Sequence, residues 1–292
     1  MTEASSLSAA PTEPARIKKF RLELVKAIPR FPNNRASLAH MQQKPLGTVL
    51  IDYLNWRSRY VGVRPRAVTV EPVAEADARW SVLSMEITAF LEKVRKGEDL
   101  TSHLSIQPHT RGYAPAARLP GATSEDRWSD KDPLLAGMGY HHFHLGTTVE
   151  AAGHVARTDD LIFAQVARET FTVIAIFDHN VFELGSTERL RLWEVHDEVS
   201  LRGVPPGSVV LSAPIMTSGH ALHVVQYAGH CARIIVKTDA EIDGKARLGD
   251  RFVAAGFTAP EKPRFEWSFH HLDLGLFEKS SRTVIWQARG WN

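Results

Sequence analysis

The stretch from Gly139 to Phe182 is the feature that most constrains how this chain can fold. It holds five of the fourteen histidines in the sequence, together with the densest run of β-branched and aromatic residues. Such residues are typical of strands, and the polar residues and glycines between the runs mark turns. The pattern predicts three strands, over residues 139–146, 161–166 and 170–177, that form an antiparallel meander.

Alternation along the first strand assigns its side chains to two faces. Tyr140, His142 and His144 share one face, while His141 and Phe143 lie on the other. One face of this strand is therefore polar.

The meander also brings residues that are distant in sequence to one end of the sheet. Because the chain runs up, down and up, we expect His144 to lie near Arg157 with Asp159, and near Asp178 with His179. Charged and imidazole groups at the end of an apolar sheet cost stability unless something uses or satisfies them. The sequence therefore predicts a functional site there.

The rest of the chain completes an α+β protein, with N-terminal helices, a central antiparallel sheet and a β-rich C-terminal part. Apolar spacing predicts helices over 46–63, 76–96 and 186–195, and alternation predicts a short strand over 20–24. We expect four regions: a flexible basic N-terminus (1–35), a helical region with a long loop (36–135), the central sheet (136–200) and a β-rich region (201–292) that extends the same sheet or stands apart. The last region contains five runs that are typical of strands: SVVLSAP, HALHVVQY, CARIIVKT, RFEWSFHHLDLGLFE and RTVIWQA.

Charge is unevenly placed along the chain. Residues 16–66 contain twelve Lys or Arg against two acidic residues, which gives 12 − 2 = +10, although the whole protein carries only +2. Such asymmetry is typical of a surface that binds nucleic acid. Four arginines near Trp56 and Tyr60 are the candidate contacts, namely Arg57, Arg59, Arg64 and Arg66.

Several classes of protein lack their signatures here. The single cysteine, Cys231, excludes an intramolecular disulfide framework. No apolar run approaches the roughly 20 residues that span a bilayer, and the N-terminus has no apolar signal core, so we expect a cytoplasmic protein without membrane contact. P-loop, dinucleotide-binding, α/β-hydrolase and zincin motifs are absent from the sequence.

The stretch 139–182 resembles the core of the RelE/YoeB-type ribonuclease toxins and their barnase-like relatives. The resemblance rests on a strand, an arginine in the following loop, LIFAQV, a tight turn, TFTVIAIF and a terminal histidine. It implies a bent antiparallel sheet that acts on RNA, with an antitoxin or the ribosome as a further partner. It also implies that Arg157 binds phosphate, that His179 is the acid and that His144 lies near the acid/base position.

The chemistry of these residues agrees with that implication. Metal-free RNA cleavage needs a base for the ribose 2′-hydroxyl, an acid for the leaving 5′ oxygen and a cation for the charge on the phosphorane. Histidine serves either proton role near neutral pH, and arginine matches phosphate oxygens. Our catalytic candidates, for an endoribonuclease without a cofactor, are His144, Arg157, His179, His142 and Asp178.

Three alternatives stay open. His142, His144 and His179 are candidate ligands for a Zn site in a metal-dependent hydrolase. A two-histidine phosphoesterase would pair HFHLGT (142–147) with GHALHVV (219–225), although neither stretch has Thr or Ser two places after its histidine. A non-enzymatic protein would keep the histidines as structural groups and bind a partner through its C-terminal part.

Overall fold

Helices and two separate sheets make up the α+β fold. The structure, a computed structural model, describes residues 13–115, 121, 128–210, 215–242, 256 and 260–292. Its helices are α1 (Ala15–Ala27), α2 (Arg35–Gln42), α3 (Leu46–Arg57), α4 (Pro72–Glu75), α5 (Ala78–Val82), α6 (Ser84–Lys96), η1 (Thr101–His103), α7 (Gln107–Thr110), α9 (Pro133–Met138), η3 (His179–Phe182), α10 (Thr187–Leu201) and α11 (Leu222–Ile242). Its strands are β1 (Ala67–Val70), β2 (Tyr140–His144), β3 (Asp160–Val166), β4 (Thr170–Asp178), β5 (Phe265–His270), β6 (Asp273–Glu278) and β7 (Thr283–Ala288).

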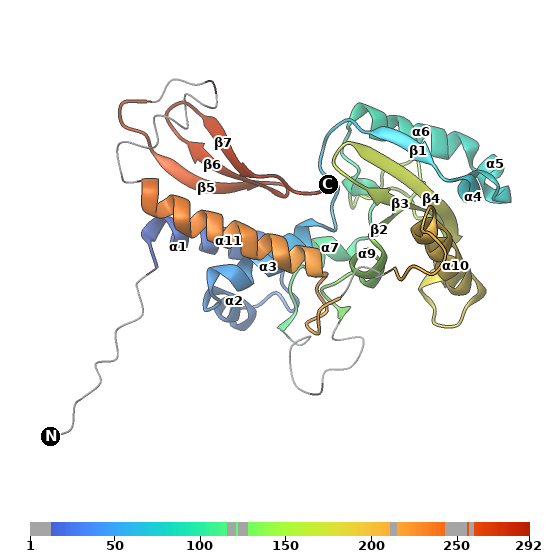
Figure 1. Ribbon diagram of the computed structural model, residues 1–292, viewed down its shortest axis with the longest axis horizontal. Helices are drawn as coiled ribbons and strands as arrows, with labels where there is room; N and C mark the ends of the chain where they lie inside the picture. The colour runs from blue at the N-terminus through green and yellow to red at the C-terminus, as the bar shows by residue number, and fades with distance from the viewer. Residues whose placement is uncertain (1–12, 116–120, 122–127, 211–214, 243–255, 257–259) are drawn as a thin grey trace.

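The central sheet has the strand order β1-β4-β3-β2 (Figure 1). Strands β2, β3 and β4 form the predicted antiparallel meander, with His144 opposite Leu161 and Asp160 opposite Asp178. A short strand that the sequence prediction missed, β1, pairs in parallel with β4. The central sheet is therefore mixed, and the meander is confirmed within it.

Apolar side chains cover both faces of this sheet, as the continuous apolar runs of β3 and β4 require. On one face, Phe90 of α6 packs against Phe143 and Phe171, with ring centroids 5.1 and 5.9 Å apart. On the other, Phe163 and Phe177 belong to a cluster with Leu192 of α10. The predicted alternation is confirmed, since Tyr140 joins the second cluster and Phe143 the first.

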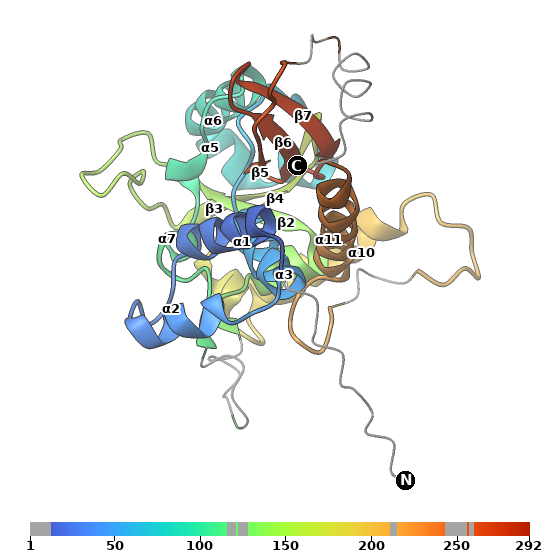
Figure 2. The same ribbon diagram turned by 90° about the vertical axis from the view of Figure 1, so that its left-hand side faces the viewer.

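The second sheet, β5-β6-β7, lies over α1 and α11 in the other half of the molecule (Figures 1 and 2). An ion pair joins the two sheets: Arg168, in the turn between β3 and β4, donates two hydrogen bonds of 2.8 and 2.9 Å to the buried Asp273 of β6. The C-terminal chain therefore packs on the central sheet through a bidentate contact, which is among the stronger hydrogen-bonded pairs.

Three of the predicted strands are helical instead. Residues 20–24 belong to α1, whose buried residues Ile17, Phe20, Leu24 and Val25 recur at helical spacing. The run HALHVVQY from Leu222 onward and the whole of CARIIVKT belong to the 21-residue helix α11. Their β-branched residues favoured strands, but the buried positions recur every three or four residues and pack against α3 and the second sheet. The region 201–292 is therefore less β-rich than predicted.

Other elements agree with the sequence more closely. Helix α3 confirms the start of the first predicted helix but ends at Arg57, six residues earlier than predicted, and the second is divided at Leu83 into α5 and α6. The run RFEWSFHHLDLGLFE is a hairpin, because the chain turns at His271, which has φ 56°. Residues 208–210 are not a strand, and 211–214 lie outside the described residues. In the part of the chain that the structure describes, no helix combines the length and apolar character needed to cross a bilayer.

Candidate functional site

A cavity of about 730 Å³ opens at the end of the central sheet where β2 ends, β3 begins and β4 ends. Four of the five catalytic candidates line it, and these are His142, His144, Arg157 and His179. The predicted convergence is thus present, because the register of the meander carries these residues to one end.

His144 and His179 are the central pair of this site. Their ring centroids lie 5.4 Å apart, with the rings tilted by 30°. His144 is buried, with 3% of its surface exposed, whereas His179 is exposed. Nδ1–H of His179 donates to the carbonyl oxygen of Asp159 at 2.9 Å, which leaves Nε2 as the nitrogen free to act on a ligand.

Local backbone contacts fix the position of His144. Its carbonyl oxygen accepts a hydrogen bond of 2.7 Å from Nδ1–H of His103. The other ring nitrogen of His103, Nε2, accepts a hydrogen bond of 3.0 Å from Nζ of Lys93. The next residue, Leu145, donates its N–H to the hydroxyl of Thr158 at 3.2 Å. The end of β2 is therefore held from α6 and from the loop that carries Arg157.

Arg157 brings an unpaired cation to the cavity. Its side chain is exposed, and within the described ranges its guanidinium makes no hydrogen bond or ion pair. Among the described residues that line the cavity are three further cations, Arg59, Lys131 and Arg189, against one carboxylate, Asp132. Lys131 is balanced by the buried Asp130 at 2.6 Å, so the excess positive charge comes from the arginines. Such a lining attracts anions.

His142 lies between the histidine pair and Asp132. Its ring stacks on Phe163 at 5.8 Å, and its Nδ1 is 3.8 Å from Oδ2 of Asp132. Burial is the main cause that lowers the pKa of His142, and the Asp132 carboxylate opposes it. His142 therefore belongs to the site but is packed more tightly than His179.

Burial also determines the charge of His144. It lowers the pKa of this imidazole to about 4, and the nearby Arg157 and His179 contribute in the same direction. His144 is thus neutral at neutral pH, and its burial disfavours the protonated form.

Asp178, the fifth candidate, is not among the residues that line the cavity. Its carboxylate accepts a 2.8 Å hydrogen bond from the backbone N–H of Asn180 and so caps the short helix η3. Asp178 therefore fixes the start of η3, and His179 is the first residue of that helix.

The four arginines proposed for nucleic acid do not form one exposed ridge. Arg66 is buried, and its guanidinium donates to the carbonyl oxygens of Ala167 and Gly62 at 2.9 and 2.8 Å. Arg64 is 3.8 Å from Asp273, and Arg57 stacks on the rings of Trp56 and Tyr60.

Arg59 differs from the other three arginines. It is buried, but it lines the cavity, and one of its terminal nitrogens donates to the carbonyl oxygen of Arg111 at 2.8 Å. Of the four, Arg59 is the one that reaches the candidate site.

Two alternatives lose their geometric basis. Among the described residues, no three His, Cys, Asp or Glu side chains converge closely enough to hold a metal ion, so His142, His144 and His179 do not form a zinc site. The phosphoesterase alternative needed 219–225 on a strand beside 142–147. That expectation is wrong, because this stretch leads into the helix α11 and pairs with neither β2 nor β3.

Sequence reasoning missed Lys131, Asp132 and Arg189 as residues of the site. The dipeptide Asp132-Pro133 is typical of a helix start, and Oδ1 of Asp132 indeed accepts from the backbone N–H groups of Leu134 and Leu135. That signal predicts the helix α9. Its position beside β2 follows only from tertiary packing.

No family model, curated protein or solved structure matches this chain in comparisons with known proteins. The resemblance over residues 139–182 therefore stays a hypothesis, and the function is inferred from the geometry of the site alone.

Proposed function

We propose that this protein cleaves RNA without a metal ion, through His144, His179 and Arg157. The observation that carries the proposal is the pairing of the two imidazoles, 5.4 Å between centroids, in a cavity that Arg157 also lines. Two proton-transfer groups and one cation are a sufficient set for metal-free cleavage by the 2′-hydroxyl.

His144 acts as the base in this mechanism. It is neutral at neutral pH, because burial lowers its pKa to about 4, so a ring nitrogen carries the lone pair that takes the proton of the ribose 2′-hydroxyl. The negative charge of the bound phosphate favours the imidazolium that forms. The 2′ oxygen then attacks phosphorus, and the bond between phosphorus and the 5′ oxygen breaks. The products are a 2′,3′-cyclic phosphate and a free 5′-hydroxyl.

His179 acts as the acid. Its Nδ1–H is engaged by the carbonyl oxygen of Asp159, so the protonated ring delivers the Nε2 proton to the leaving 5′ oxygen. One proton enters the protein at His144 and one leaves at His179, which balances the step without an oxidant or a reductant. The guanidinium of Arg157 stabilises the charge on the phosphorane oxygens.

The test is cleavage of an end-labelled RNA by purified protein in the presence of EDTA. We expect products that end in a 2′,3′-cyclic phosphate, and loss of cleavage by about 10²–10⁴-fold in His144→Gln and in His179→Gln. His230→Gln is the matched control, since His230 is exposed on α11 and does not line this cavity.

Two outcomes would contradict the proposal. RNA that stays intact with wild-type protein while still being bound would favour the non-enzymatic alternative. Cleavage that is abolished by EDTA and restored by a divalent cation would show that a metal is needed. Circular dichroism of each variant separates a loss of chemistry from a loss of fold.

A further inference from the structure

Helix α10 presents large apolar side chains to solvent along one side. Leu190, Trp193 and Leu201 are 58%, 48% and 52% exposed, and their spacing places them on the side of the helix away from the buried Leu192. Leu184, just before the helix, is 92% exposed. Exposed apolar residues are normally scattered singly, so a row of four along one element indicates a surface that binds a partner.

The charges beside this row are arranged in a definite order. Arg189 lies one helical turn before Trp193, and Asp197 lies one turn after it. The guanidinium of Arg189 is 5.9 Å from the centre of a Trp193 ring. In the part of the chain that the structure describes, neither Arg189 nor Asp197 forms an ion pair, although other charged residues of α10 do. Both charges are therefore available to a partner.

This order is complementary to itself when the helix is reversed. In an antiparallel pair of α10 helices with Trp193 at the two-fold axis, position 189 of one helix faces position 197 of the other. The same register brings position 184 beside position 201. Arg189 thus meets Asp197 twice, and Leu184 meets Leu201 twice. A partner with this pattern of charges and apolar side chains is a second copy of the same helix.

We infer that two copies of this chain associate through α10, antiparallel and with Trp193 at the two-fold axis. The inference does not depend on the proposed function, which needs a single chain. Helix α10 has 15 residues and is about 22 Å long, so the contact is small for a dimer. We therefore expect association at micromolar concentrations.

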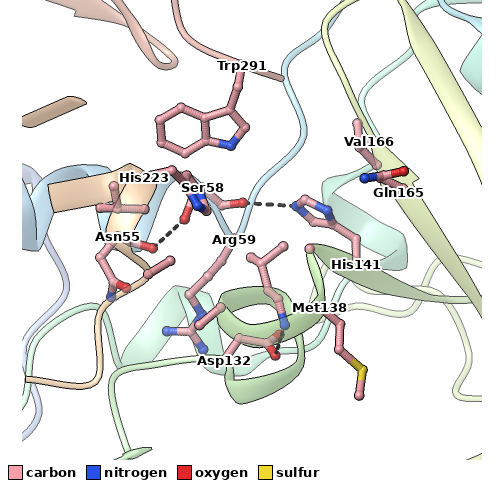
Figure 3. Close-up of a pocket in the computed structure, with 15 residues that line it drawn as sticks. Asn55, Ser58, Arg59, Asp132, Met138, His141, Gln165, Val166, His223 and Trp291 are labelled. Carbon is pink, nitrogen blue, oxygen red and sulfur yellow. Dashed lines mark hydrogen bonds between the residues drawn. The ribbon is translucent and has the colours of Figure 1, made fainter. Parts of the chain in front are cut away.

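The contact borders the first cavity. Leu184 and Arg189 line that cavity as well. The residues that line a second cavity, of about 360 Å³, among them Arg59 and Trp291, do not belong to α10 (Figure 3). A second copy bound to α10 therefore lies beside the first cavity.

Sedimentation velocity with charge-reversed variants tests the inference. Wild-type protein should change from monomer to dimer between about 1 and 100 µM. Arg189→Glu and Asp197→Arg each bring like charges together, so each should weaken association by at least about 10-fold. An equimolar mixture of the two variants should dimerise again, because the mixed dimer has opposite charges at both contacts. Lys237→Glu, an exposed change on α11, is the control and should behave as wild type.

Cross-linking tests the position of the two-fold axis. Glu194 is exposed and adjacent to Trp193, so Glu194→Cys places two thiols near the axis, where a disulfide can form. We expect diamide to convert this variant into a covalent dimer on a non-reducing gel. Val236→Cys, an exposed change on α11, should stay monomeric on the same gel. The native Cys231 is buried, so the added thiol is the one that reacts.

Several results would overturn the inference. A monomer over the whole concentration range would leave α10 to a different protein, and a dimer that neither charge reversal weakens would place the contact elsewhere. A mixture of the two folded variants that stays monomeric would refute the antiparallel register. Where circular dichroism shows that a charge-reversed variant is unfolded, the Glu194→Cys cross-link decides: its formation supports the contact and its absence overturns it. Since RNA cleavage is not measured, these results are separate from the test of the proposed function.

Discussion

His144 and His179 face each other across the start of β3, with ring centroids 5.4 Å apart, although β2, which carries His144, and β4, which His179 directly follows, are not neighbours. One ring is buried and the other is exposed. The same fold therefore gives two identical side chains different environments, and the proposed mechanism assigns them the two different roles of base and acid.

Removing the exposed histidine should affect chemistry and not stability. We expect His179→Gln to lower the rate of RNA cleavage by about 10²-fold or more. Its free energy of unfolding in urea should change by about 0.5 kcal/mol or less, because surface substitutions have small effects. A large loss of stability with an unchanged rate would instead assign His179 a purely structural role.

Stability should fall as the pH is lowered below about 6.5. The pKa of buried His141 is about 4 in the folded protein, and a histidine in an unfolded chain has a pKa of about 6.5. Between these values the unfolded state binds the proton and the folded state does not, so acid favours unfolding. Between pH 7 and pH 5 this one group should cost about 2 kcal/mol.

Urea denaturation at the two pH values measures that loss. His141→Gln should flatten the pH dependence, whereas His270→Gln, on the exposed end of β5, should not. An equal slope in wild type and His141→Gln would show that His141 is not the titrating group.

Arg157 should contribute one phosphate contact to RNA binding. For a single strand, each such contact contributes about 0.7 to the slope of log K against log salt. Arg157→Gln should therefore lower this slope by about that amount. The slope is measured by fluorescence anisotropy of labelled RNA, and both proteins carry His179→Gln so that the RNA is not cleaved during the titration. Arg95→Gln, an exposed change on α6 away from the cavity, should leave the slope unaltered.

Gly146 should be needed to place Arg157. A Cβ at position 146 would overlap the carbonyl oxygen of Ala156, the residue before Arg157. Gly146→Ala should displace this loop, weaken RNA binding and cost about 1–3 kcal/mol, as overpacking typically does. Gly47→Ala is the control, because a Cβ there meets no atom within 4 Å. Wild-type binding in Gly146→Ala would refute the coupling between this turn and the site.

The sequence of 139–182 by itself determined the meander and the end at which its polar residues meet. Alternation is a local property, so it predicted that His142 and His144 share a face and that Phe143 points into the opposite core. Turn positions then placed Arg157 and His179 beside them. The convergence of the site was therefore predictable from residues close to it in the chain.

Packing between distant segments decided the rest. The β-branched residues of 222–242 favoured strands, yet they form α11 because burial against α3 and the second sheet outweighs a propensity difference of about 1 kcal/mol or less per residue. Arg59, two residues after α3, and Asp132, the residue before α9, also reach the site. Only the tertiary structure places Arg59 there, because no local period of the sequence encodes contacts between residues about eighty positions apart.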